Sequence, residues 1–360
     1  MNSWQRWHID RPLFLALCLL SVIGIFVLYS ASGESTALVV RHALRLALGF
    51  AVLVGFAQIR PETLRRWSPY IFAIGLALLV AVLVVGSVRL GARRWLNLGL
   101  FRFQPSEIMK LGMPMMLAWY FAREPLPPKT RSIALGGAIS LLPILLVAKQ
   151  PDLGTAALIL GSVLAVLFLA GMSWRSILTV VVIAGMAAPL LWAHLHQYQK
   201  QRIITLLNPS SDPLGAGYHT IQSMIAVGSG GFFGKGWLKS SQARLDFLPE
   251  SSTDFIFAVF AEEFGFLGIL MLCCLYLFVL GRSLLIAFYA QDTYARLLAG
   301  GLALTFFMYF FVNIGMVSGI LPVVGVPLPL ISYGGSATVT LMAAFGMLMS
   351  IHTHRKMMTQ

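Results

Sequence analysis

A carboxylate at the start of an apolar segment is the strongest candidate for a catalytic group in this sequence. Asp254 ends a polar stretch that begins near Tyr198, and it directly precedes the apolar run Phe255-Ile-Phe257. A carboxylate that is partly withdrawn from water accepts a proton more readily and is a better general base. Aspartate is also a common N-cap at the start of a helix. We therefore expect Asp254 to be either a catalytic base or a helix cap.

A second set of ionisable residues lies within segments that otherwise look apolar. Glu107 and Lys110 are three residues apart and would share one face of a helix, while Asp152 opens a later apolar segment. Ionisable groups inside a membrane are costly and are therefore candidates for function. Lys110 could present positive charge to a phosphate or position a catalytic acid. The three residues could equally form a structural salt bridge between helices.

Arginines predicted to lie on the same side of the membrane as Asp254 could bind phosphate oxygens, because the guanidinium fork matches their geometry. These arginines are Arg41, Arg45, Arg93, Arg94, Arg102 and Arg202. Each could instead extend its charge to lipid headgroups. The glycine-rich run 228–236 offers backbone N–H donors but matches no nucleotide-binding loop. A reaction that needs one base, an anion clamp and accurate positioning fits these residues best.

The composition indicates a membrane protein. Of the 360 residues, 58% are hydrophobic and only 11% are charged, whereas soluble domains have about 25% charged residues. The formal net charge of +13 would suggest nucleic acid in a soluble protein. Here the basic residues are spread over loops, which indicates membrane phosphates and an anionic lipid substrate, and no nucleic acid. The three cysteines lie in apolar runs, so we expect no disulfide framework.

Ten apolar segments are long enough to cross a membrane as helices, which satisfy their own backbone hydrogen bonds in lipid. The predicted spans of this all-α polytopic membrane protein are 13–31, 38–58, 69–88, 105–122, 132–148, 154–172, 175–194, 254–281, 295–317 and 334–352. An even number of spans places both termini on one side. Basic residues in short loops on that side indicate that both termini are cytoplasmic. We expect residues 1–360 to form one integral membrane domain.

Two segments between the spans would complete the site. The long polar loop between helices 7 and 8, about 195–253, is expected to contain a short interfacial helix over 218–227. The segment 318–335 before helix 10 is apolar but rich in proline and glycine, so we predict a re-entrant turn packed on protein near the outer leaflet. Both segments would face the loops at 89–107 and 149–155.

Several motifs together resemble the SEDS family of membrane glycosyltransferases. They are Arg94-Trp-Leu96 with Arg102-Phe-Gln-Pro-Ser-Glu107, Gln150-Pro-Asp-Leu-Gly-Thr155, Asp212-Pro-Leu-Gly-Ala-Gly-Tyr-His219, Phe247-Leu-Pro-Glu250 with Thr253-Asp-Phe-Ile-Phe-Ala258, and Pro327-Leu-Pro-Leu-Ile-Ser-Tyr-Gly-Gly-Ser336. The resemblance extends over essentially the whole chain. The segment 319–327 is more similar to the elongation members of the family than to the division members.

The resemblance implies a peptidoglycan glycosyltransferase of the bacterial inner membrane, which polymerises lipid II on the periplasmic side during cell elongation. By motif position, Asp254 would be the catalytic base. The cavity would be lined by Lys110, Glu107 and Asp152, and the pyrophosphate or acceptor would be held by Arg41, Arg102 and Arg202.

The implied partners are the substrate lipid II, a class B penicillin-binding protein that acts as the transpeptidase, and the elongation proteins MreC and MreD. The pattern specifies no cofactor, and a divalent cation, Mg²⁺ or Mn²⁺, could help to stabilise the pyrophosphate charge. Two other functions fit the same residues. A charged central cleft also suits a lipid II flippase, and a non-catalytic scaffold for the penicillin-binding protein would need only the helices.

Overall fold

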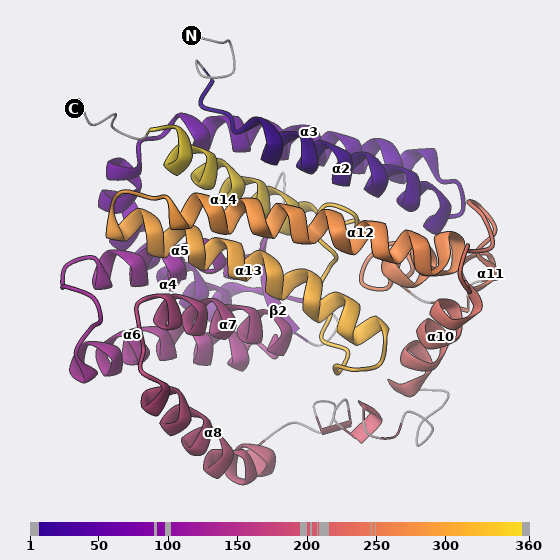
Figure 1. Ribbon diagram of the computed structural model, residues 1–360. Helices are drawn as coiled ribbons and strands as arrows, with labels where there is room; N and C mark the ends of the chain where they lie inside the picture. Colours follow the sequence, from indigo (N-terminus) through magenta and orange to yellow (C-terminus); the bar gives the residue numbers. More distant parts are fainter. Residues whose placement is uncertain are drawn as a thin grey trace.

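The chain is a bundle of long helices, described by a computed structural model (Figure 1). The structure describes residues 7–89, 92–97, 102–194, 200–201, 204–206, 208, 216–245, 247–248 and 250–354. In these ranges ten long helices occur: α2 (Arg11–Ala31), α3 (Thr36–Gln58), α4 (Pro61–Val85), α5 (Ser106–Phe121), α6 (Thr130–Lys149), α7 (Leu153–Leu169), α8 (Trp174–His194), α12 (Ile256–Phe288), α13 (Thr293–Val317) and α14 (Gly335–Thr353). The prediction of an all-α polytopic membrane protein is confirmed.

Most of these helices can cross a membrane. Among the described residues, α2, α3, α4, α6, α12, α13 and α14 are each long and apolar enough to do so, and α7 is apolar but shorter. Outer helices such as α2 expose large apolar side chains, including Leu15 at 62% and Phe26 at 54%, as expected where lipid is the solvent. In contrast, α13 and α14 are the most enclosed of these seven long helices. In their 18-residue apolar stretches, 67% and 72% of the residues are buried inside the bundle.

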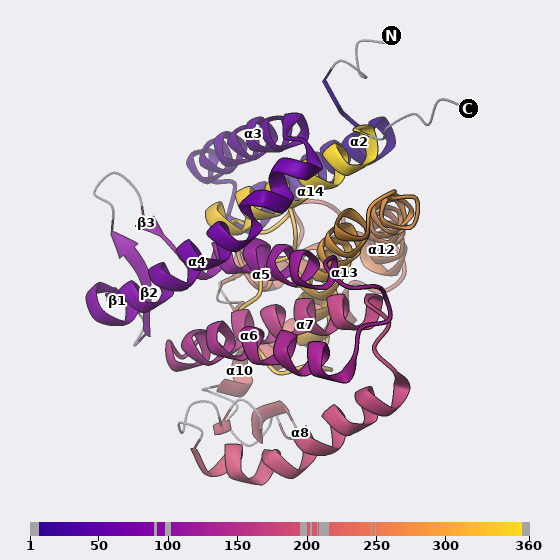
Figure 2. The same cartoon turned by 90° about the vertical axis from the view of Figure 1, so that its left-hand side faces the viewer.

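The two ends of the bundle differ in what they carry. Both termini lie at one end, while α10 (Ala216–Ser229) and α11 (Ser241–Arg244) lie at the other (Figure 1). The short helix α10 confirms the helix predicted over 218–227. In the second view, α8 lies apart from the other long helices, as it does in the first (Figure 2).

The helix α4 begins eight residues before the predicted start at 69. Pro61 occupies its first turn, where the missing N–H of proline is not needed, and Glu62 follows it. A negative charge in the first turn also complements the helix dipole. As a result, Arg65 and Arg66, which we expected in a loop, lie on the first two turns of α4.

A small antiparallel sheet connects α4 to α5, and the sequence analysis did not predict it. It consists of β1 (Ser87–Arg89), β2 (Ala92–Asn97) and β3 (Arg102–Phe103), in the order β1-β2-β3. Ser87 pairs with Trp95, and Leu96 pairs with Phe103. The sheet places Arg94, in the middle of β2, at the end of the bundle that carries α10 and α11.

The helix α12 is broken at Gly265, and the glycine-rich run of the long loop fills the break. Gly265 has a φ of 62°, a conformation that glycine adopts without strain. The N–H groups of Lys235 and Gly236 donate to the C=O groups of Glu262 and Glu263, both at 3.0 Å. In return, the N–H groups of α12 at 266 and 267 donate to the C=O groups of the loop at 231 and 232, at 2.9 and 3.1 Å.

The loop approaches α12 so closely that only glycine fits. A Cβ atom on Gly234 would lie 2.1 Å from the backbone oxygen of Glu263. The buried carboxylate of Glu262 completes the attachment by accepting hydrogen bonds from Lys235 Nζ at 2.6 Å, Ser240 Oγ at 2.5 Å and Ser241 Oγ at 2.6 Å. The glycine-rich run is therefore a structural connection to α12.

Candidate functional site

Asp254 lies in a turn immediately before α12, at the end of the bundle opposite the termini. The N-cap of α12 is Phe255, so Asp254 is not the helix cap that the sequence allowed. Its side chain is half-buried. Its backbone C=O accepts a hydrogen bond from Asn313 Nδ2 at 2.9 Å, and the same amide donates to the C=O of Val326 at 2.7 Å. Asn313 of α13 therefore ties the Asp254 turn to the segment that follows α13.

That segment, 319–334, is the proline- and glycine-rich stretch between α13 and α14, and it has no regular helix. Ser332 Oγ donates to the C=O of Thr253 at 2.6 Å, and the N–H of Tyr333 donates to the C=O of Ser252 at 2.9 Å. A Cβ atom on Gly325, whose φ is +71°, would lie 3.2 Å from Asp254 Oδ2. The re-entrant segment is packed on protein, as its composition predicted, and the structure adds that it lies directly against the Asp254 carboxylate.

The other side of the re-entrant segment packs on α7. A Cβ atom on Gly154 would lie 2.4 Å from the backbone oxygen of Val324, the residue before Gly325. Asp152 is the N-cap of α7 and accepts the N–H of Thr155 at 3.2 Å. Two consecutive residues of the re-entrant segment therefore connect the first turn of α7 to the Asp254 turn.

Asp152 is held by residues from the small sheet and from the start of α5. Gln104 Nε2 donates to Asp152 Oδ2 at 3.1 Å, and Arg94 Nη1 lies 3.9 Å from Asp152 Oδ1. Arg94 also donates to the backbone C=O groups of Gln150 and Pro151. The Arg94 side chain therefore fixes the connection between α6 and α7. It also pairs with the Asp152 carboxylate, which we expected to interact with Lys110.

Lys110 forms its ion pair within α5. Its Nζ lies 2.7 Å from Glu107 Oε1, and the two side chains are only 6% and 5% exposed. The ammonium group also lies 5.0 Å from the ring centroid of Tyr309. In the described part of the chain, Lys110 makes no ion pair with Asp152, so the expected three-residue cluster is divided into a buried pair and a separate capping carboxylate.

The predicted arginines are distributed unevenly. Arg41 of α3 has an exposed side chain. Arg45, one turn further along α3, contacts the re-entrant segment, with its guanidinium carbon 4.3 Å from the ring centroid of Tyr333. Arg102 lies in β3, but its side chain falls outside the described residues, and Arg202 lies outside them entirely.

Three polar residues of this region were not among the predicted site residues. Asn313 and Tyr309 are buried on α13, and a signal for both was present, because they interrupt the apolar run 295–317. His219 of α10 stacks on Phe255 with ring centroids 5.7 Å apart, and burial lowers the pKa of His219 below its usual value. Nothing in the sequence indicated that α10 would lie against the residue next to Asp254.

The side chains that could act as ligands determine how this site could bind a metal cation. No three His, Cys, Asp or Glu side chains come together to form a metal site within the described ranges. Mg²⁺ commonly binds through one or two carboxylates together with substrate phosphates, which needs no such group of protein ligands. A divalent cation held largely by substrate phosphates therefore stays a prediction.

Comparison with known proteins identifies the family to which this chain belongs. A family model described as "Cell cycle protein", which covers FtsW, RodA and SpoVE, matches residues 10–357. The chain belongs to the FtsW/RodA/SpoVE family. This is the SEDS family that the sequence motifs resemble, and the expectation is confirmed.

Individual members of the FtsW/RodA/SpoVE family match over nearly the whole chain. The chain is 53% identical to peptidoglycan glycosyltransferase MrdB of Escherichia coli strain K12, over 99% of this chain and 97% of MrdB. It resembles a chain of a solved peptidoglycan synthase complex, with a TM-score of 0.85, 32% identity, and coverage of 96% of this chain and 98% of that one. RodA of Thermus thermophilus gives a TM-score of 0.74 at 28% identity, over 97% and 98% of the two chains. The chain is a multi-pass membrane protein of this family.

Proposed function

We propose that this chain is a peptidoglycan glycosyltransferase that polymerises lipid II into glycan strands during cell elongation. The proposal is supported by its relatives, since a protein named as a peptidoglycan glycosyltransferase shares 53% identity over 99% of the chain. The single observation that carries it is the position of Asp254. Its half-buried carboxylate lies against Gly325 of the re-entrant segment, at the end of the bundle where the polar segments meet.

Asp254 acts as the general base. The 4-hydroxyl of one sugar attacks the anomeric carbon of another, and a new C–O bond forms while the bond from that carbon to the pyrophosphate breaks. The hydroxyl proton passes to the Asp254 carboxylate, and the electron pair leaves with undecaprenyl pyrophosphate. Pyrophosphate is a good leaving group, so no strong general acid is required. Attack from the opposite face inverts the anomeric configuration.

Basic residues near the site stabilise the pyrophosphate charge as it develops. Arg41, Arg102 and Arg202 hold the pyrophosphate or the acceptor, and Arg41 is suited to this role because its side chain is exposed while that of Arg45 contacts Tyr333. The buried Lys110–Glu107 pair and Asp152 line the substrate cavity that we propose beside Asp254. A divalent cation would be held mainly by the substrate phosphates, and it would neutralise part of their charge.

The proposed cellular location follows from the membrane topology that the sequence predicts. Residues 1–360 form one domain in the bacterial inner membrane, with both termini cytoplasmic and Asp254 on the periplasmic side. The transpeptidase partner is a class B penicillin-binding protein, and MreC and MreD belong to the same elongation machinery. A similar solved chain is part of a peptidoglycan synthase complex described as coordinating polymerization and crosslinking, which supports this partnership.

The test is a gel-based polymerisation assay with the purified full chain, its transpeptidase partner and lipid II. Asp254→Asn keeps the size of the side chain but removes the base, and we expect polymer formation to fall at least about 100-fold. Glu34→Gln is the matched control, because Glu34 is an exposed carboxylate in the turn between α2 and α3, outside the family motifs, and it should polymerise normally. Normal polymer from a folded Asp254→Asn variant would contradict the assigned role.

The same samples separate the alternative functions. If the chain is a flippase, labelled lipid II will change leaflets in vesicles that form no polymer. If the chain is a scaffold, substitutions at Asp254 and Lys110 will leave glycan synthesis by the assembled complex unchanged. The glycosyltransferase proposal expects neither result.

A further inference from the structure

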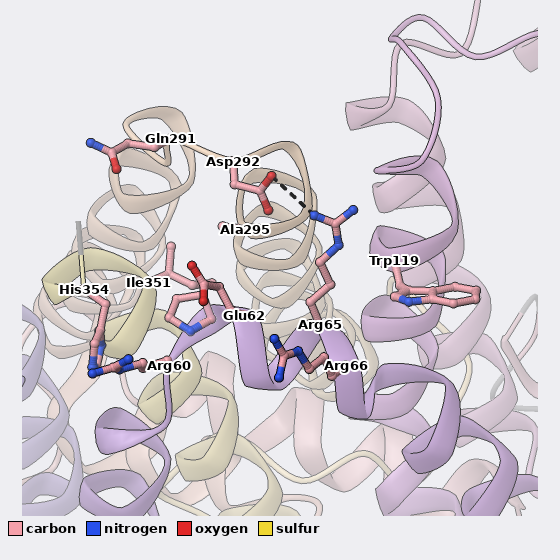
Figure 3. Close-up of a pocket in the computed structure, with 11 residues that line it drawn as sticks. Arg60, Glu62, Arg65, Arg66, Trp119, Gln291, Asp292, Ala295, Ile351 and His354 are labelled. Carbon is pink, nitrogen blue, oxygen red and sulfur yellow. Dashed lines mark ion pairs between the residues drawn. The ribbon is translucent and has the colours of Figure 1, made fainter. Parts of the chain in front are cut away.

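A cavity of about 830 Å³ lies at the end of the bundle opposite Asp254 (Figure 3). Its wall is formed by the start of α4, the end of α5, the start of α13 and the end of α14. The helix α12 begins beside Asp254 and ends at Phe288, three residues before Gln291 in the cavity wall. Its 33 residues correspond to roughly 50 Å of helix, so this cavity is separate from the candidate active site.

Three arginines line the cavity, and they differ in how they are paired. Arg65 points toward Asp292, with Nη1 3.8 Å from Oδ1, so this pair connects α4 to α13 (Figure 3). Arg60 and Arg66 have exposed side chains and form no ion pair with a carboxylate in the part of the chain that the structure describes. Two guanidinium groups are therefore available to a ligand at the cavity mouth.

Aromatic residues place this mouth at the level of the lipid headgroups. Trp119 lines the cavity, and the guanidinium carbon of Arg123 lies 3.4 Å from its ring centroid. Trp67 and Tyr70 on the early turns of α4 are 46% and 69% exposed, and Tyr289 at the end of α12 is 59% exposed. Tryptophan and tyrosine concentrate where the membrane meets water, with their rings at headgroup depth.

We propose that this cavity binds the phosphate group of an anionic phospholipid from the leaflet at this end of the bundle. Guanidinium groups bind phosphate oxygens with two parallel hydrogen bonds, and basic pockets between helices at a membrane surface bind lipid headgroups. The pairing of Arg65 with Asp292 holds the wall, while Arg60 and Arg66 supply the positive charge. A soluble phosphate has the same chemistry, but the surrounding aromatic residues favour a ligand held in the lipid.

The experiment is native mass spectrometry of the purified full chain, titrated with phosphatidylglycerol or phosphatidylcholine of the same acyl chains. We expect the wild type to retain phosphatidylglycerol preferentially. The double variant Arg60→Gln/Arg66→Gln should bind it about tenfold or more weakly, since it removes the two cavity guanidinium groups that would bond to the phosphate oxygens. The matched control is Lys129→Gln/Arg131→Gln, which removes two exposed cations at the same end but outside the cavity and should bind like the wild type.

A second arm distinguishes lipid from soluble phosphate. Inorganic phosphate and the lipid-free headgroup glycerophosphoglycerol are added as competitors, and neither should displace the bound lipid. Displacement by inorganic phosphate, equal retention of the two lipids by the wild type, or unchanged binding by the double variant would each overturn the proposal. Unchanged phosphatidylcholine binding and a monodisperse elution profile show that a variant is folded. The outcome is independent of the proposed glycosyltransferase activity.

Discussion

Two regions at opposite ends of the helix bundle, the surroundings of Asp254 and the basic cavity, use charged residues in different ways. Near Asp254, the charged side chains have partners within the protein. Lys110 Nζ lies 2.7 Å from Glu107, and Asp152 interacts with Gln104 and Arg94. In the basic cavity, Arg65 pairs with Asp292, while Arg60 and Arg66 are exposed and form no ion pair with a carboxylate among the described residues.

This difference separates groups that position the site from groups that bind a ligand. A buried ion pair is expensive to desolvate and is kept in one geometry by its partner, so it is poorly suited to exchange that partner for a substrate. A half-buried carboxylate such as Asp254, or an exposed arginine such as Arg41, can do so at lower cost. The predictions below test the distinction, from the largest expected effect to the smallest.

The largest effect is expected from breaking the buried pair. Lys110→Met leaves the Glu107 carboxylate buried without its cation, and we expect the free energy of unfolding to fall by about 3–5 kcal/mol. The double variant Glu107→Leu/Lys110→Met removes both charges and should recover most of this loss. Thermal unfolding in one detergent measures both variants. A Lys110→Met protein as stable as the wild type would show that this pair is not structural.

A smaller effect, on activity, is expected at the re-entrant segment. Gly325→Ala adds a methyl group 3.2 Å from Asp254 Oδ2 and should displace the carboxylate. A contact at 3.2 Å requires a shift of only a fraction of an ångström, so we expect the rate to fall about tenfold, less than the roughly 100-fold cost of a 1 Å misplacement. Gly33→Ala is the control, because its φ of +63° imposes the same backbone strain while nothing lies within 4 Å of the added atom. Equal polymerisation rates for the two variants would contradict the role of this contact.

The smallest effect is a pH dependence of stability at the end that carries the termini. Asp10 precedes α2, outside the spanning helices. Burial alone would raise its pKa, but hydrogen bonds from Arg282, at 2.6 and 3.1 Å, and from the N–H of Leu13 lower it below the usual 3.8. The folded state therefore gains stability above about pH 4, which is lost as the pH falls through the lowered pKa. Asp10→Asn should be less stable at neutral pH by a few degrees of melting temperature, with the difference vanishing in acid. A constant difference at every pH would contradict this assignment.

The sequence was sufficient to predict most of the fold. Hydropathy alone locates ten helices, because a lipid environment leaves few other backbone structures available. The proline- and glycine-rich composition of 318–335 excluded a regular helix, and the observed segment has none. Its packing on the Asp254 turn is a contact that the composition did not specify. The short helix over 218–227 was also predictable, because an isolated amphipathic stretch in a polar loop has few other structures.

What the sequence could not supply were contacts between distant segments. Arg41 and Arg45 are one turn apart on α3, and only the position of Tyr333 in space decides that Arg45 contacts the re-entrant segment. The pairing of Asp152 with Arg94 depends on the small sheet, whose strands are too short to give a periodic pattern. Pro61 and Glu62 are typical of the start of a helix and could have predicted where α4 begins. The basic residues Arg65 and Arg66 that follow them instead favoured a loop.

The insertion of the glycine-rich loop into α12 fixes the length of that loop. Four backbone hydrogen bonds join residues 231–236 to the two sides of the Gly265 break, so the loop has a register with α12 in the way that one strand has with its neighbour. Adding or deleting a single residue between Gly231 and Gly236 would misalign these bonds and carry the misfit to the helical turn that follows Asp254. The loop should therefore tolerate exchange of its exposed side chains, such as Phe233 at 78%, far better than any change in the number of its residues.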